Sequence, residues 1–196
     1  MKNLIVLIAF LGLLSCNINP NNNEQEVSGV SISDNTYNIE TSQSQIIWTG
    51  RELSTSSHYG SLNFVSGTFE VLDGVIVGGE FIVDMTSINN QDMEGGSKER
   101  LEGHLKSDDF FSVDTHPTAT LSINSSELIS EGKWSISADL SIKGYTHPVN
   151  FEMISSEQGW SANLVFDRSK YDVRFRSGTF FENLGDKLIY LSLIHI

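Results

Sequence analysis

The side chains best suited to acid–base chemistry in this sequence are its five histidines. They are His58, His104, His116, His147 and His195. A hydrolase of the Ser-His-Asp type needs a nucleophile, a base and an orienting carboxylate that converge. None of the five histidines lies beside a recognisable nucleophile motif. The sequence therefore predicts that the protein is not an enzyme, and no catalytic residue is assigned.

One polar stretch holds five residues of the types that bind metal ions, namely His104, Asp108, Asp109, Asp114 and His116. Imidazole and carboxylate groups are ligands for zinc and related ions. The same residues are also typical of a solvated loop with capping aspartates and a turn at Pro117. The second interpretation is favoured, so we expect no metal site and no cofactor.

Asp167 and Arg168 stand together at the end of a strand-like segment. Arg168 has two possible roles there. It can meet the anionic or hydroxyl head of a ligand, or it can form a salt bridge with Asp167 at the rim of the domain. The salt bridge is the commoner arrangement and contributes little to stability.

The single cysteine, Cys16, follows a charged start at Lys2 and an apolar run over residues 4–14. This order is typical of a signal peptide, and the apolar run is too short to span a bilayer. Leu13-Leu14-Ser15-Cys16 resembles the lipobox of bacterial lipoproteins, which implies cleavage before Cys16 and acylation of that residue. The alternative is an incidental cysteine behind an ordinary secretory cleavage site. We expect Cys16 to anchor the protein to a membrane of the cell envelope, on its periplasmic side or outer surface.

Charge and composition exclude other classes of protein. The chain has 12 Lys and Arg residues against 25 Asp and Glu residues, a formal net charge of −13. No run of basic residues is present that would neutralise a row of phosphates, so nucleic acid is excluded as a partner. A hydrophobic fraction of 39% is enough for a core, which argues against wholesale disorder. We expect one folded domain.

The predicted organisation has three parts. Residues 1–15 form the signal peptide. Residues 16–36, which are rich in Asn, Ser and Glu, form a flexible tether that carries lipidated Cys16. Residues 37–196 form the domain.

Alternation of apolar and polar residues dominates the domain and indicates β-strands. The clearest example is residues 134–142, where Trp134, Ile136, Ala138, Leu140 and Ile142 alternate with polar residues. Similar patterns predict about eight strands, with more possible near Tyr37 and Leu188. The turn signals between them are Ser66-Gly67, Asp73-Gly74, Glu131-Gly132, Lys143-Gly144 and Gln158-Gly159. The sequence therefore predicts an all-β fold, an antiparallel up-and-down lipocalin-like β-barrel, with either a filled interior or room for one ligand.

One segment leaves the strand pattern. Over residues 97–111, Leu101 and Leu105 are four residues apart, and Ser97 with Arg100 resembles an N-cap turn, which predicts a short helix. We expect Phe110 and Phe111, which follow it, to return to the barrel as a wall or lid of a cavity, or alternatively as a solid plug.

Five sequence segments, in order, resemble the YceI-like family of exported β-barrels over about residues 37–190. They are Ser66-Gly67-Thr68-Phe69-Glu70 with Asp73-Gly74, the segment Gly79–Ile88, the segment Leu101–Phe111, His116-Pro117-Thr118-Ala119-Thr120, and the segment Ala138–Thr146. The resemblance implies a lipocalin-like barrel with an elongated apolar pocket for a polyisoprenoid or similar amphiphile, and it implies no reaction. Residues 188–196 depart from the family pattern because they lack the expected acidic residues.

The alternating aromatic residues are first of all candidates for the core. The resemblance adds that several also line a ligand pocket, and the expected lining is Trp48, Phe64, Phe69, Phe81, Val83, Met85, Phe110, Phe111, Leu140, Phe151 and Phe166. The favoured hypothesis is a lipid-anchored binding protein that holds or shuttles an isoprenoid or amphiphilic lipid. The alternative is a fully packed barrel that binds another envelope protein and holds no lipid.

Overall fold

The computed structural model describes residues 32–51, 57–173 and 189–194. Cys16, the predicted signal peptide and His195 lie outside these residues. The strands are β1 (Asn35–Asn38), β2 (Gln45–Arg51), β3 (Ser57–Leu72), β4 (Val75–Asn90), β5 (Thr118–Ser130), β6 (Lys133–Ile142), β7 (Tyr145–Ser156), β8 (Gly159–Phe166) and β9 (Ile189–Ile194). The helices are α1 (Gly95–Lys106) and the short 3₁₀ helix η1 (Arg168–Tyr171). Within the described ranges no helix is long and apolar enough to cross a membrane.

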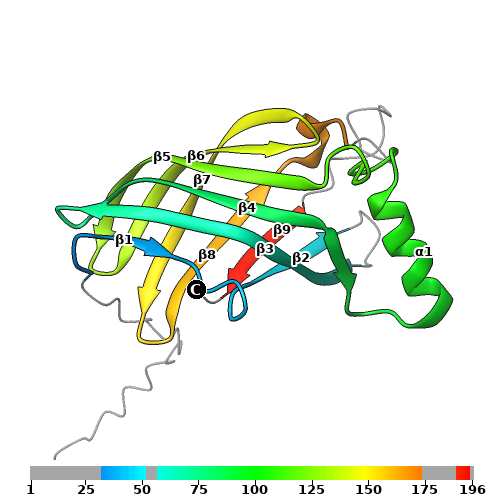
Figure 1. Ribbon diagram of the computed structural model, residues 1–196, viewed down its shortest axis with the longest axis horizontal. Helices are drawn as coiled ribbons and strands as arrows, with labels where there is room; N and C mark the ends of the chain where they lie inside the picture. Colours follow the sequence, from blue (N-terminus) through cyan, green and yellow to red (C-terminus); the bar gives the residue numbers. More distant parts are fainter. Residues whose placement is uncertain (1–31, 52–56, 174–188, 195–196) are drawn as a thin grey trace, which may run out of the picture.

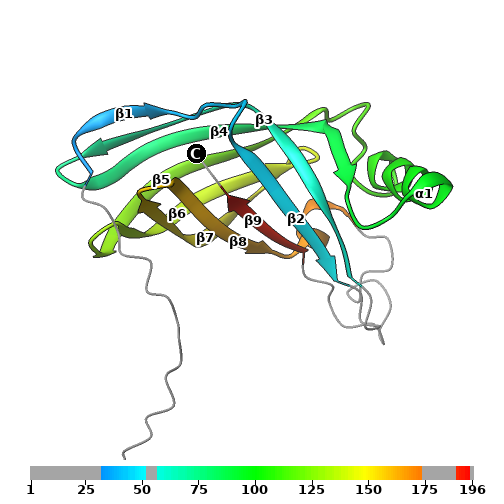
Figure 2. The ribbon, with the colours of Figure 1, turned by 90° about the horizontal axis from the view of Figure 1, so that it is seen from below.

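The strands form one closed antiparallel sheet. Each strand from β2 to β9 pairs with the next along the chain, and β9 also pairs with β2, which completes the ring. Strand β1 pairs with the half of β3 that extends beyond β2. Figures 1 and 2 show the sheet curling round on itself, with β9 between β8 and β2. The predicted all-β, up-and-down lipocalin-like barrel with one short helix is therefore confirmed.

Two of the predicted hairpin turns have the backbone that a tight two-residue turn requires. Asp73 and Gly74 have φ angles of 52° and 75°, and Lys143 and Gly144 have 53° and 79°. Both central residues of a type I′ turn need a positive φ, and this turn suits the twist of antiparallel strands. These turns therefore set the registers of the β3–β4 and β6–β7 hairpins.

The predicted turn at Ser66-Gly67 is wrong, because β3 runs through it without interruption. A β-bulge lies there instead, between the pairs Phe64/Val83 and Ser66/Ile82. A Cβ atom on Gly67 would lie 2.6 Å from Cδ1 of Phe81 and 2.8 Å from Cδ1 of Ile39. The glycine is needed for close packing against these side chains, not for a change of chain direction.

Alternation along β6 gives the barrel an apolar interior face. Trp134, Ile136, Ala138, Leu140 and Ile142 are all buried, with exposed fractions between 0% and 5%. The residues between them are half-buried. The five apolar residues of this strand therefore face the interior, as the alternation in the sequence indicates.

The two ends of the barrel differ. The turn end carries the β3–β4, β5–β6 and β7–β8 turns together with β1, whereas the helix end carries α1, the β6–β7 turn and η1 (Figures 1 and 2). Helix α1 begins at Gly95 with Glu94 at its N-cap position, so the predicted N-cap at Ser97 is wrong. The Ser97 hydroxyl lies in the first turn and accepts a hydrogen bond from Nη2 of Arg100 at 3.1 Å.

We expect Leu140→Asp to unfold the domain, because the side chain is 5% exposed and an unpaired carboxylate would be placed in the apolar interior. Ser137→Asp on the same strand is the control, since its position is half-buried on the other face. Thermal melting followed by circular dichroism distinguishes the two. A Leu140→Asp variant that melts like the parent would contradict the inward assignment.

Candidate ligand-binding site

The apolar residues predicted to line a pocket come from β2, β3, β4, β6, β7 and β8 and from the loop after α1. Nine are buried, namely Trp48, Phe64, Phe69, Phe81, Met85, Phe110, Leu140, Phe151 and Phe166. Val83 and Phe111 are half-buried and pack against the same core. The residues therefore share one interior, and their contact with a ligand stays a prediction.

An aromatic cluster, made of Tyr37, Phe69, Trp134 and Trp160, fills the barrel at the turn end. The ring of Phe69 stacks on Tyr37 at 5.1 Å between centroids and meets Trp160 edge-on at 4.7 Å. Trp160 also lies 5.3 Å from Trp134. Nε1 of Trp134 donates a hydrogen bond to the backbone oxygen of Gly74 at 3.0 Å, so the cluster also ties down the β3–β4 turn. This end of the interior is therefore occupied by well-packed rings.

Sequence reasoning assigned only Phe69 of this cluster to the site. The alternation over residues 134–142 places Trp134 on the apolar face of a predicted strand, but alternation does not tell how far along the barrel a side chain lies. Tyr37 is on β1, whose pairing with β3 puts it opposite Phe69. That cross-strand pairing is a long-range contact, and it has no local sequence signal.

At the helix end, the loop after α1 brings Phe110 and Phe111 onto the barrel. Amide N–H groups of Phe110 and Ser112 both donate to the backbone oxygen of Ser107, at 3.0 and 2.8 Å. Ser112 takes a positive φ of 49°, which folds the chain tightly. The two phenyl rings then meet edge-on at 4.8 Å, with Phe110 buried and Phe111 half-buried.

Arg168 is buried at this end, with an exposed fraction of 4%. Its guanidinium carbon lies 5.1 Å from the centre of the Phe110 ring, and Nη1 donates to the backbone oxygen of Val173 at 2.8 Å. The Asp167 carboxylate instead accepts hydrogen bonds from the amide and hydroxyl of Ser169, at 2.9 and 2.7 Å. Arg168 thus stabilises the position of the Phe110 ring by a cation–π contact.

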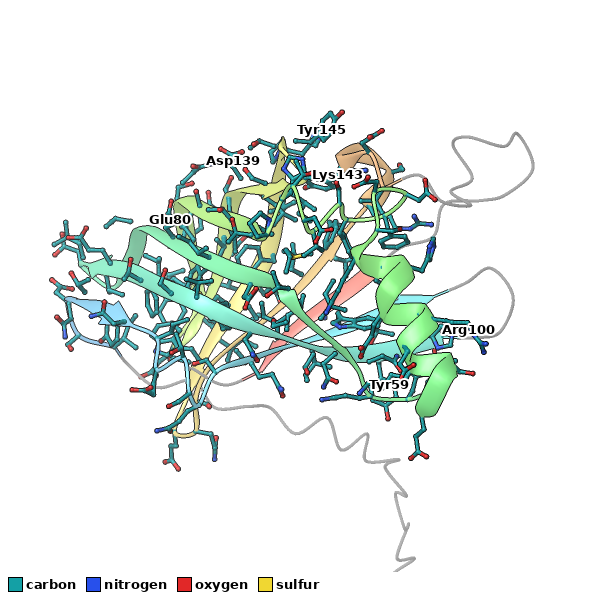
Figure 3. All side chains as sticks on the ribbon, turned by 45° about the vertical axis from the view of Figure 1, so that its right-hand side comes forward. Tyr59, Glu80, Arg100, Asp139, Lys143 and Tyr145 are labelled. Carbon is teal, nitrogen blue, oxygen red and sulfur yellow. The ribbon has the colours of Figure 1, made fainter. Side chains whose placement is uncertain are left out.

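Lys143 joins three segments at the helix end. From the β6–β7 turn its Nζ donates to the backbone oxygens of Asp108 and Asp172, at 3.0 and 3.1 Å. It also lies 3.6 Å from Oδ2 of Asp172. Figure 3 shows Lys143 next to Tyr145, on the same side of the barrel as Asp139 and Glu80. The lysine therefore links the loop that carries Phe110 to η1.

Tyr171 on η1 is a buried titratable group at the helix end. Burial, reinforced by the negative charges of Asp167 and Asp139, raises the pKa of the Tyr171 phenol to about 12. Its ring packs edge-on against Phe166 at 5.4 Å and against His147 at 5.2 Å. Tyr171 therefore stays neutral at physiological pH and acts as part of the apolar wall.

A polar network centred on Asp92 joins β3, β4 and α1. The Asp92 carboxylate receives hydrogen bonds from Nδ1 of His58 at 2.8 Å, from the amide of Tyr59 at 2.9 Å and from Nδ2 of Asn90 at 2.5 Å. The backbone N–H of Asn90 donates a further hydrogen bond, to Oε1 of Glu102 on α1 at 2.7 Å. Burial alone would raise the pKa of Asp92, but these hydrogen bonds outweigh it and lower the pKa.

The histidine contacts do not resemble a catalytic triad. His58 is bonded to Asp92, and Nε2 of His147 is bonded to the backbone oxygen of Lys170 at 2.9 Å. His104 packs edge-on against Phe110 at 5.6 Å. Asp108 accepts a hydrogen bond from the Ser112 hydroxyl at 2.6 Å, which is a loop contact. Over residues 32–51, 57–173 and 189–194 no group of three or more metal-ligating side chains comes together.

Trp48 on β2 differs from Trp134 in the hydrogen bonding of its indole N–H. It is 8% exposed and points into the barrel with Ile46, and it pairs across the sheet with Gly60. A Cβ atom on Gly60 would lie 2.6 Å from Cζ2 of the Trp48 ring, so the glycine makes room for the indole. Nε1 of Trp48 has no hydrogen-bond acceptor in the part of the chain that the structure describes.

Comparison with known proteins decides the family. A family model described as the YceI-like domain matches residues 37–189. The chain belongs to the YceI-like family. No curated protein matches this member of the family.

Two solved structures share the fold of this YceI-like protein. BcnA of Burkholderia cenocepacia superposes with a TM-score of 0.60 at 15% identity, covering 79% of this chain and 98% of BcnA. A polyisoprenoid binding domain from Saccharophagus degradans superposes with a TM-score of 0.50 at 12% identity, covering 82% of this chain and 97% of that domain. At such low identity the likeness concerns the fold.

We expect Asp92→Asn to lower the free energy of unfolding at neutral pH by about 1 kcal/mol, because the charged acceptor of the His58 bond is lost. The pKa of Asp92 is lowered in the folded state, so its contribution is fully present above the unfolded-state pKa and disappears as the pH falls through the folded-state pKa. The difference between parent and variant should therefore shrink as the pH falls below 3.8, the ordinary pKa of an aspartate.

Urea unfolding of both proteins from pH 7 down to pH 2.5 measures this difference. Asp73→Asn is a matched control, because Asp73 is exposed and Asn also tolerates its positive φ. A difference that persists unchanged to pH 2.5 would show that the Asp92 charge is not its source.

Proposed function

We propose that this protein binds a long apolar molecule, of the polyisoprenoid or amphiphilic lipid class, inside its barrel. The observation that carries the proposal is the apolar interior of a closed barrel, to which every strand with described side chains from β2 to β8 contributes buried apolar residues. Such a surface suits an isoprenoid tail, because a chain without polar groups gains its binding free energy from the burial of apolar surface. The likeness to a polyisoprenoid binding domain supports the same class of ligand.

The two ends of the barrel suggest how the ligand enters. The aromatic cluster of Tyr37, Phe69, Trp134 and Trp160 blocks the turn end with rings 4.7 to 5.7 Å apart. At the helix end the wall is made by the Phe110–Phe111 loop, a mobile type of element compared with a hairpin-linked sheet. In the proposed mechanism the tail enters at the helix end and Phe111, which is half-buried, covers it.

The role is proposed to be binding, not catalysis. The described hydrogen bonds of His58 and His147 go to a carboxylate and a backbone oxygen, which orient a ring but supply no nucleophile. The protein is further proposed to be held at a membrane of the cell envelope through an acylated Cys16, which would keep the barrel close to its lipid ligand.

One observation favours the alternative of an envelope interaction protein with a packed barrel. Leu72, Val77, Leu128 and Ile129 are between 42% and 53% exposed around the β3–β4 and β5–β6 turns. Exposed apolar side chains that gather on one surface are typical of contact sites. The binding function requires a lipid inside the barrel, whereas the interaction function does not. The presence or absence of lipid in the purified protein therefore distinguishes the two functions.

The binding function is tested by mass spectrometry of an organic extract of the purified domain. We expect a co-purifying long-chain lipid, and we expect Phe111→Ala to lose most of it while melting, after delipidation, close to the parent. Leu128→Ala, on the outer surface, is the control and should retain the lipid. A stable parent protein without lipid would support the alternative function. Unchanged lipid with strongly lowered melting would mean that Phe111 is core.

The anchor is tested separately by Cys16→Ser. We expect the parent to enter the detergent phase of a detergent–water partition and the variant to stay in water or remain uncleaved, because acyl chains on Cys16 supply the proposed attachment. A variant that still partitions like the parent would rule out Cys16 as the anchor.

A further inference from the structure

The indole N–H of Trp48 is a buried hydrogen-bond donor without an acceptor in the part of the chain that the structure describes. Trp48 is more than nine-tenths buried, and its Nε1 has no described partner. The indole N–H can only donate. A buried donor left unpaired costs about 1–3 kcal/mol, and such groups are rare in folded proteins, where a partner normally accounts for them.

Trp134 shows that the fold can satisfy an indole in the same interior. Its Nε1 donates to the backbone oxygen of Gly74 at 3.0 Å and thereby holds a turn. At Trp48, by contrast, the neighbouring position on β3 is Gly60, which has no side chain to offer. The inward-facing described neighbours Ile46 and Leu62 are apolar. The protein therefore places one donor among side chains that cannot accept from it.

We infer that Trp48 is the polar contact for the ligand, and that the ligand carries an uncharged hydrogen-bond acceptor, such as a ketone, ester or amide carbonyl, on its isoprenoid or alkyl chain. The inference rests on the proposed binding function and narrows its ligand class. A hydrocarbon would leave the indole unpaired, whereas a carbonyl oxygen satisfies it.

The surroundings of Trp48 favour an uncharged group over a phosphate. Transfer of an anion into an apolar interior is costly unless a cation pairs with it. The buried cation of the described interior, Arg168, already lies over Phe110 and donates to the backbone oxygen of Val173. Oγ of Ser44, another buried polar atom without a described partner, belongs to the same stretch of chain as Trp48 and carries no charge. An anionic head would therefore have to stay outside, at the barrel mouth.

The test is a competition between matched ligands on the delipidated full domain. Geranylgeranylacetone, a ketone, competes with the hydrocarbon in which its carbonyl is replaced by a methylene, and native mass spectrometry measures the ratio of the two complexes. We expect the parent to favour the ketone by about fivefold to tenfold, the range of one hydrogen bond. Trp48→Phe, which keeps an aromatic ring but removes the donor, should bring the ratio close to one.

Two further variants keep the result interpretable. Replacing Trp48 with benzothienylalanine exchanges the N–H for sulfur in a ring of nearly the same shape, so it should give the same loss as Trp48→Phe even if the smaller ring loosens the barrel. Trp134→Phe removes the other indole donor and should lower the melting temperature but leave the ligand ratio at the parent value.

The outcomes separate this inference from the function on which it rests. If the parent binds both ligands and the Trp48 variants do not change their ratio, the role of Trp48 is overturned while the binding function stands. If the parent binds neither ligand, the binding function fails and the inference with it. If geranylgeranyl phosphate displaces the ketone from the parent and not from the Trp48 variants, Trp48 recognises an anionic head and the uncharged class is wrong.

Discussion

Closure of the sheet is the constraint on which the rest of this structure depends. Every strand with described side chains from β2 to β8 has buried apolar residues on one face, and such faces can be buried together only if the sheet returns to itself. Strand β9 makes this possible because it pairs with both β8 and β2. The long strands β3 and β4, with 16 residues each, then extend beyond the ring and receive β1. A closed ring also leaves no long unpaired edge that could recruit another chain.

Burying a polar group in a closed apolar interior costs free energy unless the group has a partner. Most of the buried polar groups that the structure describes have one, through a hydrogen bond or a cation–π contact. Arg168 is paired with a backbone oxygen and a phenyl ring, Asn90 bonds the backbone of β3 and the carboxylate of Asp92, and Trp134 bonds a turn. These contacts fix the positions of the segments at the two ends of the barrel. Against this background, the unpaired indole of Trp48 is a departure that a structural role alone does not explain.

The sequence was enough to predict the barrel, because alternation in β6 and its neighbours follows from the geometry of a strand with one wet face. Glycine was harder to interpret. Gly74 and Gly144 mark turns, whereas Gly67 lies in the middle of a strand and serves close packing against Ile39 and Phe81. The dipeptide Ser66-Gly67 does not distinguish these uses. The aromatic cluster at the turn end also escaped prediction, because the height of a ring within a barrel depends on register between distant strands.

The place where the chain enters the barrel has a mechanical consequence. Oδ1 of Asp34 accepts a hydrogen bond from the amide of Gly74 at 3.4 Å, and Asn35 pairs with Val71, so the amino-terminal side of the domain is fastened at the turn end. The helix end lies at the opposite pole, a distance of roughly 50 Å along a 16-residue strand such as β3. A flexible chain of about 15 residues spans about 20 Å on average. If the proposed anchor on Cys16 holds the barrel upright, the helix end would face away from the bilayer, and cargo would pass to an acceptor facing that bilayer unless the barrel lay on its side.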